Sequence, residues 1–558
     1  MRYLALASDY DGTLAADGVV APETLDALER FRRSGRKLIL VTGRELPDLR
    51  RVFPHFNLFD RIVAENGAVL FDPATNEKSV LAAPPKPAFV DALMWQGVSP
   101  LGVGDVIVST WHPNEKIVLE VIRDLGLELQ VIFNKGAVMV LPSGVNKMSG
   151  LDAALNALGL SEHNVVGVGD AENDHAFLAH CEFSVAVANA LPAVKETADF
   201  TTHADRGAGV VELIDMILED DLAPRNSSLP RRMIPVGREG DQEVAIPAYN
   251  GGVLVSGASG SGKSTLVAGL LEALVERKYQ VCLIDPEGDY GTFPDTIAVG
   301  DEKHAPSLEQ ILQALRKPQV QVVANLMGIA LADRPAFCAS LLPHLQEMRL
   351  RTGRPHWLII DEAHHLLPPG WVSAEPVAAL NNVVLITVHP DHLDPAALKA
   401  IDVVFAVGPS PEKVLAVFGI NESQELAPGE ALAWFRESGK TRRVKLAQSN
   451  AERKRHKRKY ALGELGEDRS FYFRGPRGQL NLRAQNLMLF VQLAEGVDDD
   501  TWSFHLRHGD YSRWFRDGIK DEALAEEAAQ IENNSALDPR SSRERIKQAI
   551  ELRYTAPA

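Results

Sequence analysis

The sequence predicts a multidomain protein of the α/β class. Two stretches, 1–220 and 233–447, each alternate short apolar segments with amphipathic helical segments, which is the pattern of parallel sheets covered by helices. The last stretch, 471–558, is mostly polar sequence with apolar residues at helical spacing. We therefore expect two α/β domains followed by a mostly helical C-terminal domain, which suits 558 residues at roughly 100–200 residues per domain.

Composition limits the class of protein and its partners. Hydrophobic residues make up 45% of the chain and charged residues 24%, as in ordinary globular proteins. No apolar run approaches the roughly 20 residues that span a bilayer, so we expect no membrane partner. The net charge of −17 argues against a chain that coats nucleic acid along its whole length. Three widely spaced cysteines indicate neither a disulfide framework nor a zinc site, so we expect a cytoplasmic protein.

Two polar stretches separate the predicted domains. Residues 221–232 are rich in Pro, Ser and charge, and we expect a linker there. Residues 448–470 contain the basic run ERKRHKRKY (452–460), which is either a solvated linker or a contact for nucleic acid phosphates.

The first predicted strand is followed by two carboxylates in the stretch DYDGTL. Asp9 is placed at the carboxyl end of this strand, where open α/β sheets hold their active sites. Asp9 could attack phosphorus and form an aspartyl-phosphate. Asp11 could protonate the leaving oxygen and later activate water. Because two carboxylates repel a phosphate dianion, this chemistry needs Mg²⁺ held by few protein oxygens.

Further polar residues follow the next strands in chain order. Thr42 and Gly43 in LVTGR suit hydrogen bonds to phosphate oxygens, and Lys147 opens a helix and could neutralise the phosphate. The stretch GVGDAENDHAFL supplies an amide for the phosphate, Asn173, between two more carboxylates. The predicted metal ligands of this domain are therefore Asp9, Asp11, Asp170 and Asp174.

These four stretches together resemble the motifs of the haloacid dehalogenase (HAD) superfamily of phosphatases. Two more, ENGAVLF (65–71) and SVAVANA (184–190), resemble the branch that contains Cof-type, sugar-phosphate and archaeal-type phosphoglycolate phosphatases. The resemblance implies a Rossmann-like domain over 1–220 that hydrolyses a small phosphorylated metabolite. It also implies an inserted α+β cap over about 73–143, which closes over the site and excludes water. In this cap, three residues are either specificity contacts or merely pack and solvate the cap: Trp111, His112 and Glu115.

The second α/β stretch begins with a phosphate-binding loop. GASGSGKST fits G-x-x-x-x-G-K-[ST], follows an apolar strand and opens a helix, which is the context that this motif requires. The backbone amides would wrap the phosphates of ATP, Lys263 would reach the outer ones, and Ser264 would hold Mg²⁺. The predicted nucleotide-binding residues are Gly257, Ala258, Ser259, Gly260, Ser261, Gly262, Lys263, Ser264, Thr265 and Asp361.

A second motif, HWLIIDEAHHLLP, indicates ATP hydrolysis. Asp361 would steady the Mg²⁺ through water, and Glu362 would be the catalytic residue that polarises the attacking water. A fusion of a kinase with a phosphatase, of the polynucleotide end-repair sort, is a rival interpretation. A kinase transfers phosphate to a substrate hydroxyl and has little use for a water-activating Glu, so the Asp-Glu pair favours an ATPase.

Two further stretches resemble the HerA–FtsK group of ATPases. They are CLIDPEGDY (282–290) and the hairpin-like entry to the phosphate loop, 234–265. This group carries a polar sensor, typically glutamine, where this chain has Val388 and His389 after Thr387. The resemblance implies a homo-oligomer, in general a hexameric ring in which an arginine reaches the neighbour's nucleotide. The candidates for this arginine, which are equally readable as surface residues at a helix end, are Arg349, Arg351 and Arg354.

The C-terminal stretch resembles, in FHLRHGDYSRWFRDGIKDEALA, a small helical domain family of unknown function. We expect His505, Asp510 and Trp514 to be core and capping residues, and the domain to be a binding or sensor module.

Three functions remain open at this point. The first is a Mg²⁺-dependent phosphatase for a small phosphorylated substrate, fused to an ATP-hydrolysing domain. The second is a hexameric HerA-like ATPase that translocates DNA and carries an accessory HAD domain. The third is a regulatory phosphatase that ATP binding gates.

Overall fold

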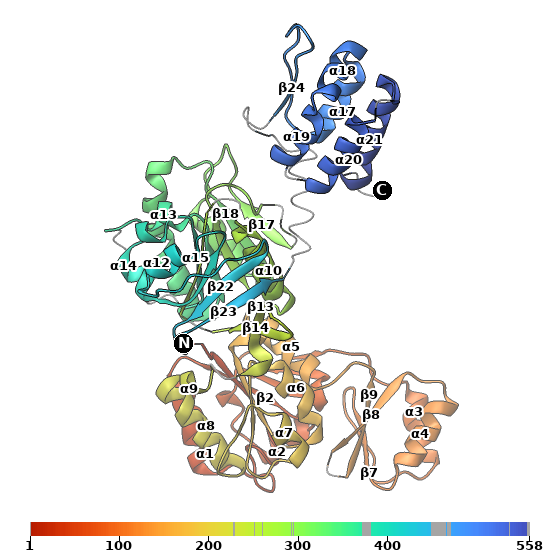
Figure 1. The fold of residues 1–558 in the computed structure, drawn as a ribbon. Helices are drawn as coiled ribbons and strands as arrows, with labels where there is room; N and C mark the ends of the chain where they lie inside the picture. The colour runs from red at the N-terminus through yellow and green to blue at the C-terminus, as the bar shows by residue number, and fades with distance from the viewer. Residues whose placement is uncertain are drawn as a thin grey trace. The chain divides into compact units, whose positions relative to one another are not determined.

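The structure is a computed structural model, and Figure 1 shows its fold. The chain divides into two compact units. The first spans Met1–Lys263, Ala273–Gly291 and Asp295–Leu446 and contains both large sheets, and the second contains the C-terminal helices. The described residues are 2–134, 136–226, 229–249, 251–258, 261–291, 293, 295–370, 381–447, 465, 470–519, 521–534 and 536–554.

The first domain is built on an eight-stranded sheet with the strand order β12-β11-β10-β1-β2-β3-β4-β5. Its strands are parallel from β12 to β3. β4 pairs with β3 in antiparallel, and β5 pairs with β4 in antiparallel. β1 is buried along its whole length, so its sequence is a continuous apolar run up to its last two residues. The strands are β1 Ala5–Asp9, β2 Lys37–Val41, β3 Arg61–Ala64, β4 Val69–Asp72, β5 Glu77–Val80, β10 Val165–Gly169, β11 Phe183–Ala186 and β12 Phe200–Thr201.

Helices cover both faces of this sheet. Figure 1 shows α1 and α8 on one face and α5 and α6 on the other. The helix α5 begins with a capping box, in which the Asn146 side chain accepts the N–H of Ser149 and the Ser149 hydroxyl accepts the N–H of Asn146. The helices and 3₁₀ turns are α1 Pro22–Arg33, α2 Leu46–Val52, α5 Lys147–Leu158, α6 His175–His180, α7 Pro192–Thr197, α8 Arg206–Asp220, α9 Ala223–Asn226, η1 Phe56–Leu58, η2 Glu65–Gly67, η3 Glu162–Asn164, η4 Glu172–Asp174 and η5 Pro230–Arg232.

A small α+β layer is inserted between β5 and α5. Its antiparallel sheet has the order β6-β7-β9-β8, and α3 and α4 pack on one face of it around Phe89 and Val118. Its elements are α3 Pro87–Trp95, β6 Gly102–Val103, β7 Val108–Trp111, α4 Glu115–Asp124, β8 Leu129–Asn134 and β9 Ala137–Pro142. This layer is the cap that the sequence leads one to expect.

The stretch 221–232 is anchored to the first domain rather than being a loose tether. Leu222 and Leu229 are buried in the hydrophobic core of this domain. Arg231 donates from Nε to Asp199 at 2.9 Å. These contacts join residues that are far apart in the sequence. Composition cannot reveal such contacts and therefore indicates only a polar linker.

The second domain is built on an eleven-stranded sheet with the order β14-β13-β23-β22-β21-β15-β20-β19-β16-β18-β17. The strands from β21 to β17 are parallel, and an antiparallel extension begins at β22. The strands are β13 Met233–Glu239, β14 Gln242–Pro247, β15 Gly252–Ser256, β16 Val281–Asp285, β17 Thr296–Val299, β18 Gln321–Asn325, β19 Trp357–Ile360, β20 Val383–Thr387, β21 Ile401–Val407, β22 Glu430–Phe435 and β23 Lys440–Leu446. The helical elements are α10 Lys263–Glu276, α11 Leu308–Leu315, η6 Leu331–Asp333, α12 Arg334–Thr352, α13 Ala363–Leu366, η8 Pro390–His392, α14 Pro395–Lys399 and α15 Pro411–Ala416.

The C-terminal domain is a short hairpin packed with five helices. Its aromatic core includes Trp502 stacked on Tyr511, with ring centroids 4.4 Å apart. His505 is buried, with Nδ1 2.8 Å from Asp510 and Nε2 accepting the N–H of Arg474 at 3.1 Å, so both ring nitrogens hold the fold together. The elements are β24 Phe471–Phe473, β25 Leu482–Ala484, α17 Leu487–Gly496, α18 Asp499–Arg507, α19 Asp510–Asp517, α20 Glu522–Glu532 and α21 Pro539–Tyr554.

Two sequence-based expectations concern segments between or beyond these elements. The basic run 452–460 lies outside the described residues. Within the described part of the chain, no helix has the combination of length and apolar character needed to cross a membrane.

Candidate functional site

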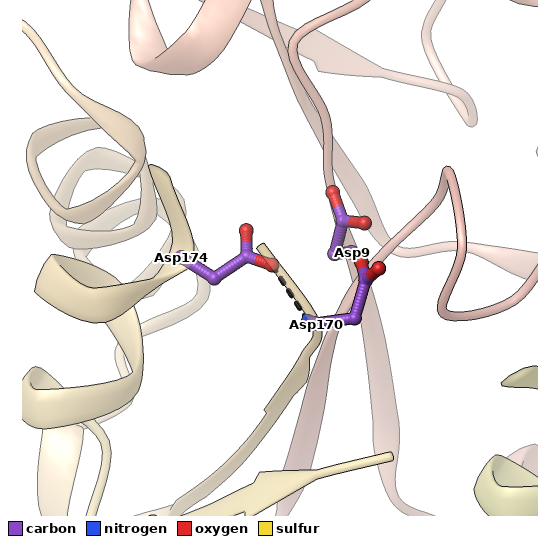
Figure 2. Close-up of side chains that lie close together, drawn as sticks. All are labelled: Asp9, Asp170 and Asp174. Carbon is purple, nitrogen blue, oxygen red and sulfur yellow. Dashed lines mark hydrogen bonds between the residues drawn. The ribbon is translucent and has the colours of Figure 1, made fainter. Parts of the chain in front are cut away.

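The carboxyl edge of the first sheet collects the polar residues of the first candidate site. Asp9 ends β1, and Asp170 directly follows β10, which pairs with β1 in parallel. Figure 2 shows the carboxyl groups of Asp9, Asp170 and Asp174 gathered at this edge. One oxygen of each lies within 4.8 Å of the others, and all three residues are buried. The parallel register therefore brings together carboxylates that are more than 150 positions apart in the sequence.

Lys147, the first residue of α5, supplies the positive charge of this group. Its ammonium donates to both Asp9 and Asp174 and is only 1% exposed. Burial raises the pKa of Asp9 to about 8, with Lys147 opposing the rise and Asp174 and Asp170 adding to it. Burial alone would lower the pKa of Lys147, but Asp174 and Asp9 raise it above its ordinary value. Three buried carboxyl groups beside one ammonium favour a further cation at this position, because a cation stabilises the ionised form of each carboxyl group.

The donor atoms of this group fit Mg²⁺, which prefers hard oxygen ligands and usually takes one or two carboxylates together with water. The two oxygens of Asp174 are already engaged. Its Oδ2 accepts the N–H of Asp170 at 2.8 Å and of Ala171 at 2.9 Å, and its Oδ1 accepts from Lys147. We therefore propose Asp9 and Asp170 as the main ligands of such a cation and a supporting role for Asp174.

Asp11, expected among the metal ligands, does not join this group. Arg44 donates to it through two parallel hydrogen bonds, Nε to Oδ2 at 2.6 Å and Nη2 to Oδ1 at 2.7 Å. This bidentate contact holds the carboxylate at the edge of the site, with 41% of its side chain exposed. Asp11 therefore lies at the rim of the site, outside the group of buried carboxylates.

A strained turn after β3 organises the phosphate-binding residues. Asn66 has a left-handed backbone, with φ of 53°, and its N–H donates to the carbonyl of Thr42 at 3.0 Å. Its Oδ1 accepts from Nδ2 of Asn173 at 2.9 Å, while its own buried Nδ2 has no hydrogen-bond partner among the described residues. A phosphate oxygen would satisfy such a donor. Gly67 completes the turn, since a Cβ there would lie 1.9 Å from the carbonyl oxygen of Asn146, just before Lys147.

The same turn also fixes the cap through Glu65, whose φ is 50°. Its buried carboxylate accepts three backbone N–H groups at the base of the cap, from Asp105, Val106 and Ile107, at 2.8 to 2.9 Å. The strand-ending ENG tripeptide is the sequence signal for this turn, but the partners of Glu65 lie some forty residues away and were missed.

The cap brings its own side chains toward the edge of the sheet. A Cβ on Gly43 would lie 3.3 Å from Cε of Met139 on β9, so the cap contacts the predicted phosphate-binding glycine. Trp111 pairs in register with Ala137 and is therefore on the same face of the cap sheet as Met139. His112 lies 2.9 Å from Glu115 and is largely exposed.

The second candidate site surrounds the phosphate loop between β15 and α10. Ser259 and Gly260 of this loop lie outside the described residues. Gly257 passes so close to β21 that a Cβ would lie 2.0 Å from the carbonyl oxygen of Val407. Lys263 donates to the carbonyls of Gly257 at 2.9 Å and Ala258 at 3.0 Å. The buried hydroxyl of Ser261 has no hydrogen-bond partner among the described residues, so the loop retains donors for phosphate oxygens.

The acidic residues of this site follow β19 and β16. Burial raises the pKa of Asp361 to about 7, and burial together with Glu287 raises that of Glu362. Glu287 belongs to the loop after β16, which Asp285 holds by accepting the N–H groups of Glu287, Gly288 and Tyr290. This crowding of carboxylates near Lys263 suits a site for Mg²⁺ and ATP.

His364 lies beside Thr387, where the sensor residue is expected. Nδ1 of His364 lies 3.1 Å from the Thr387 hydroxyl and 3.4 Å from the Glu362 carboxylate. The N–H of His389 donates to the same hydroxyl at 3.0 Å. Burial, with smaller contributions from neighbouring histidines and Lys263, lowers the pKa of His364 to about 4. The neutral imidazole of His364 thus lies between Glu362, the candidate for water activation, and Thr387 at the end of β20.

Two of the three candidate arginine fingers donate to backbone carbonyls within the chain. Arg349 is half-buried and donates to the carbonyls of Pro355 at 2.7 Å and Asn381 at 2.8 Å. Arg354 is 2% exposed and donates to the carbonyl of Gly159 at 2.8 Å. Both guanidinium groups thus bind backbone carbonyls of the same chain, and the burial of Arg354 contradicts its interpretation as a surface residue. Arg351 is exposed and pairs with Glu347 at 2.6 Å.

Known protein families match both α/β domains. A family model described as a haloacid dehalogenase-like hydrolase matches residues 6–96 and 115–214, and a model described as an AAA domain matches 248–415. A phosphoglycolate phosphatase of Methanothermobacter thermautotrophicus is 31% identical over 220 residues, which are 38% of this chain and 96% of that protein. Another, from Halorubrum lacusprofundi, is 30% identical over 37% of this chain and 95% of its own length. A crystal structure of a haloacid dehalogenase-like hydrolase from Bacteroides thetaiotaomicron is 19% identical, with a TM-score of 0.35, over 39% of this chain and 100% of that one.

Proposed function

Because this chain belongs to the haloacid dehalogenase-like hydrolases and carries an AAA domain behind its hydrolase domain, we propose that it is a Mg²⁺-dependent phosphatase for a small phosphorylated molecule. The observation that carries the proposal is the buried group of Asp9, Asp170 and Asp174 around Lys147 at the carboxyl edge of the first sheet. Bound Mg²⁺ would neutralise this group and the incoming phosphate.

Different residues of the chain bind the phosphate, attack phosphorus and transfer protons. Lys147, Thr42 and Asn173 bind and orient the phosphate. Asp9 attacks phosphorus, and the bond to the leaving oxygen breaks while Asp11 gives that oxygen a proton. A water molecule then attacks the aspartyl-phosphate, Asp11 takes its proton, and inorganic phosphate leaves with Asp9 regenerated. Arg44 keeps Asp11 at the rim, where the leaving group enters and departs.

The substrate class follows from the cap and the relatives. The proteins similar to this domain are named phosphoglycolate phosphatases. The close approach of Met139 in the cap to Gly43 supports a small substrate rather than a polymer. We therefore propose phosphoglycolate or a small sugar phosphate as the substrate.

The test compares activity with and without the metal and the nucleophile. The purified protein should hydrolyse p-nitrophenyl phosphate with Mg²⁺ and lose this activity in EDTA. Asp9→Asn should lower the activity by at least about a thousandfold, because an amide is a poor nucleophile and a poor metal ligand. Undiminished turnover by Asp9→Asn would sink the mechanism.

For the second domain we propose ATP binding and hydrolysis. Lys263 contacts the outer phosphates, Asp361 steadies Mg²⁺ and Glu362 polarises water. Lys263→Ala should abolish ATP turnover but keep phosphatase activity in the absence of nucleotide, and Asp9→Asn should show the reverse. Each variant thus serves as the folding control for the other, and ATP turnover that survives Lys263→Ala would contradict the proposal.

A further inference from the structure

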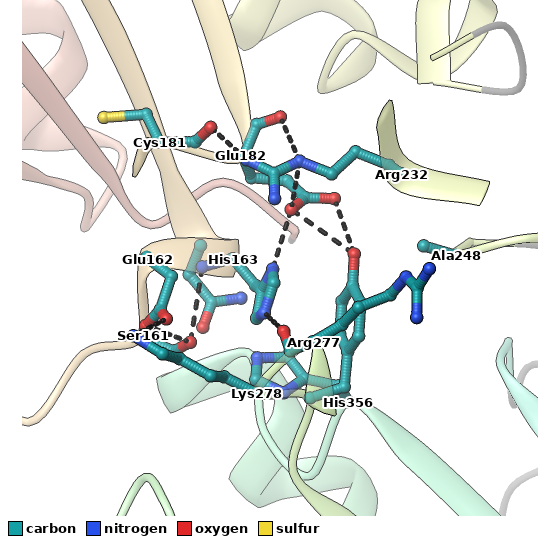
Figure 3. A network of polar contacts seen from close by, with 12 residues as sticks. Ser161, Glu162, His163, Cys181, Glu182, Arg232, Ala248, Arg277, Lys278 and His356 are labelled. Atoms are coloured by element: carbon teal, nitrogen blue, oxygen red, sulfur yellow. Dashed lines mark hydrogen bonds and ion pairs between the residues drawn. The ribbon is translucent and has the colours of Figure 1, made fainter. Parts of the chain in front are cut away.

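The two α/β domains meet at a buried ionic cluster centred on Glu182, just before β11 (Figure 3). Its carboxylate is 0% exposed and lies 2.6 Å from Arg2, 2.8 Å from His163 and 3.2 Å from Arg232. The hydroxyl of Tyr279, in the second domain, donates to it at 3.3 Å. These cations hold the pKa of Glu182 well below its usual range despite its burial.

His163 bridges the two domains within this cluster. Figure 3 shows its ring between Glu182 and the backbone of Arg277. Nδ1 lies 2.8 Å from the Glu182 carboxylate and Nε2 lies 2.7 Å from the carbonyl oxygen of Arg277, so the ring contacts both through its two nitrogens. The ring also stacks on Tyr279, with centroids 3.7 Å apart. A buried side chain of the first domain is thus fixed to two points of the second.

A second bridge lies at the end of α5. Arg354, whose guanidinium is buried in the second domain, donates to the carbonyl of Gly159 at 2.8 Å. Gly159 is the C-cap of α5, and Gly353 beside Arg354 packs so closely on Asn164 that a Cβ would lie 2.1 Å from its amide nitrogen.

Each bridge joins the far ends of two elements that carry candidate catalytic residues. α5 begins at Lys147 and ends at the Gly159 bridge, and β10 starts beside His163 and leads to Asp170. α10 begins at Lys263 and ends at Glu276, with Arg277 as its C-cap.

β19 also connects the junction to candidate catalytic residues. This strand follows the bridge residue Arg354 by a short turn and leads to Asp361 and Glu362. The two candidate sites therefore lie at opposite ends of elements that meet at the junction.

The lengths of the connecting helices favour coupling through the fold over a direct electrostatic effect. α5 is about 18 Å long and α10 about 21 Å at 1.5 Å per residue. These lengths exceed the screening length of about 8–10 Å in physiological salt. Any influence of one site on the other has to travel through these packed elements and the hydrogen bonds that join them.

We propose that the junction makes the two sites allosterically coupled, so that nucleotide on the phosphate loop and phosphate in the phosphatase site change each other's affinity. This rests on the proposed function of both domains. Since the coupling is one free energy shared by two ligands, its factor must be the same in both directions.

The experiment measures that factor in the full-length protein with inorganic phosphate and fluorescent mant-ADP. The inhibition constant of phosphate against aryl phosphate turnover is measured with and without saturating Mg²⁺ and mant-ADP. The dissociation constant of mant-ADP is then measured with and without saturating phosphate. We expect both constants to change by the same factor of at least about five.

Three variants locate the coupling. His163→Phe keeps the stack on Tyr279 but removes both hydrogen bonds, and Arg354→Met removes the bond to Gly159. Either one should bring the factor close to one. His203→Phe, a matched change at an exposed histidine that pairs with Glu212, should leave it intact. His163→Phe leaves a buried carboxylate with one partner fewer, so Arg354→Met serves as the independent variant if the first does not fold.

Phosphate could also act directly on the nucleotide loop. The effect of phosphate on mant-ADP should therefore disappear in Lys147→Ala, which removes the phosphate-binding ammonium of the first site. A factor of one in the unmodified protein, or an unchanged factor in both bridge variants, overturns the inference. Because phosphatase and ATPase activities are measured separately, that result leaves the proposed function standing.

Discussion

Asp170 and Asp174 lie four positions apart but have different surroundings. Asp174 stabilises the fold, because it accepts hydrogen bonds from two backbone N–H groups and from the ammonium of Lys147. Asp170 contacts the hydroxyl of Thr13 at 3.1 Å and follows β10 at the centre of the edge. The sequence predicts both residues as metal ligands. Their contacts support the proposed division, in which Asp170 is a ligand and Asp174 supports the site.

This difference predicts opposite effects of two amide substitutions. Asp170→Asn should abolish the rise in melting temperature that Mg²⁺ causes, yet leave the melting temperature in EDTA unchanged or higher, because it removes buried negative charge. Asp174→Asn should lower the melting temperature in EDTA by the equivalent of about 1–3 kcal/mol, since Lys147 and the backbone lose an acceptor. Thermal scans of both variants with and without Mg²⁺ check this. Equal behaviour of the two variants would contradict the division of roles.

The residues that sequence predicted at this site share one property. Asp9 ends a parallel strand, and Thr42 and Asp170 each directly follow one, so linear spacing was enough to bring them to one edge. Glu65 and Arg44 escaped prediction, because their roles depend on partners across the cap insertion or on the opposite side of a loop.

At the scale of elements, α5 is held by a close contact between two glycines. A Cβ on Gly150 would lie 2.4 Å from Cγ1 of Val63 and 2.6 Å from the Cα of Gly67. The helix therefore packs directly on the strained turn after β3, and this contact sets the position of Lys147 one turn earlier. The helical pattern of the sequence predicted α5 but not the requirement for glycine at this contact.

Gly150→Ala should consequently impair catalysis beyond its effect on stability. Overpacking of this kind costs about 1–3 kcal/mol, and the displacement of α5 should lower kcat at least about tenfold. The control is Ala157→Gly on the exposed side of the same helix, which costs about 1 kcal/mol in helix propensity without moving Lys147. Melting temperature and kcat of both variants check the prediction. If Gly150→Ala has normal kcat, α5 is not positioned by this contact.

At the scale of the whole molecule, the sequence indicated two separate α/β domains but gave no sign that they share a buried interface. Glu182, His163 and Arg354 carry no motif, and their contacts join residues up to about two hundred positions apart. The same reason applies to Arg354, whose contact with the carbonyl of Gly159 no local pattern predicts. Patterns along the chain report periodicity and local motifs, and a junction between domains has neither.

The junction predicts how stability depends on pH. In the native protein, the pKa of Glu182 lies well below its ordinary value of 4.5. As pH falls, the unfolded chain therefore takes up this proton before the native protein does. The stabilisation from ionised Glu182 is fully present above about pH 4.5 and decreases progressively below it.

Glu182→Gln should then be strongly destabilising near neutral pH and less so in acid. The amide leaves the buried guanidinium of Arg2 and the nearby Arg232 without a counter-charge, which costs about 3–5 kcal/mol for a broken buried pair. We expect the melting temperature of the first unit to drop by several degrees at pH 6–8, and the difference from the unmodified protein to shrink as pH falls below about 4.5. Glu430→Gln is the control, because Glu430 pairs with Arg443 at the surface and such pairs contribute about 0–1 kcal/mol. A difference between Glu182→Gln and the unmodified protein that is small at pH 7, or that does not shrink in acid, would show that the cluster does not hold the two domains together.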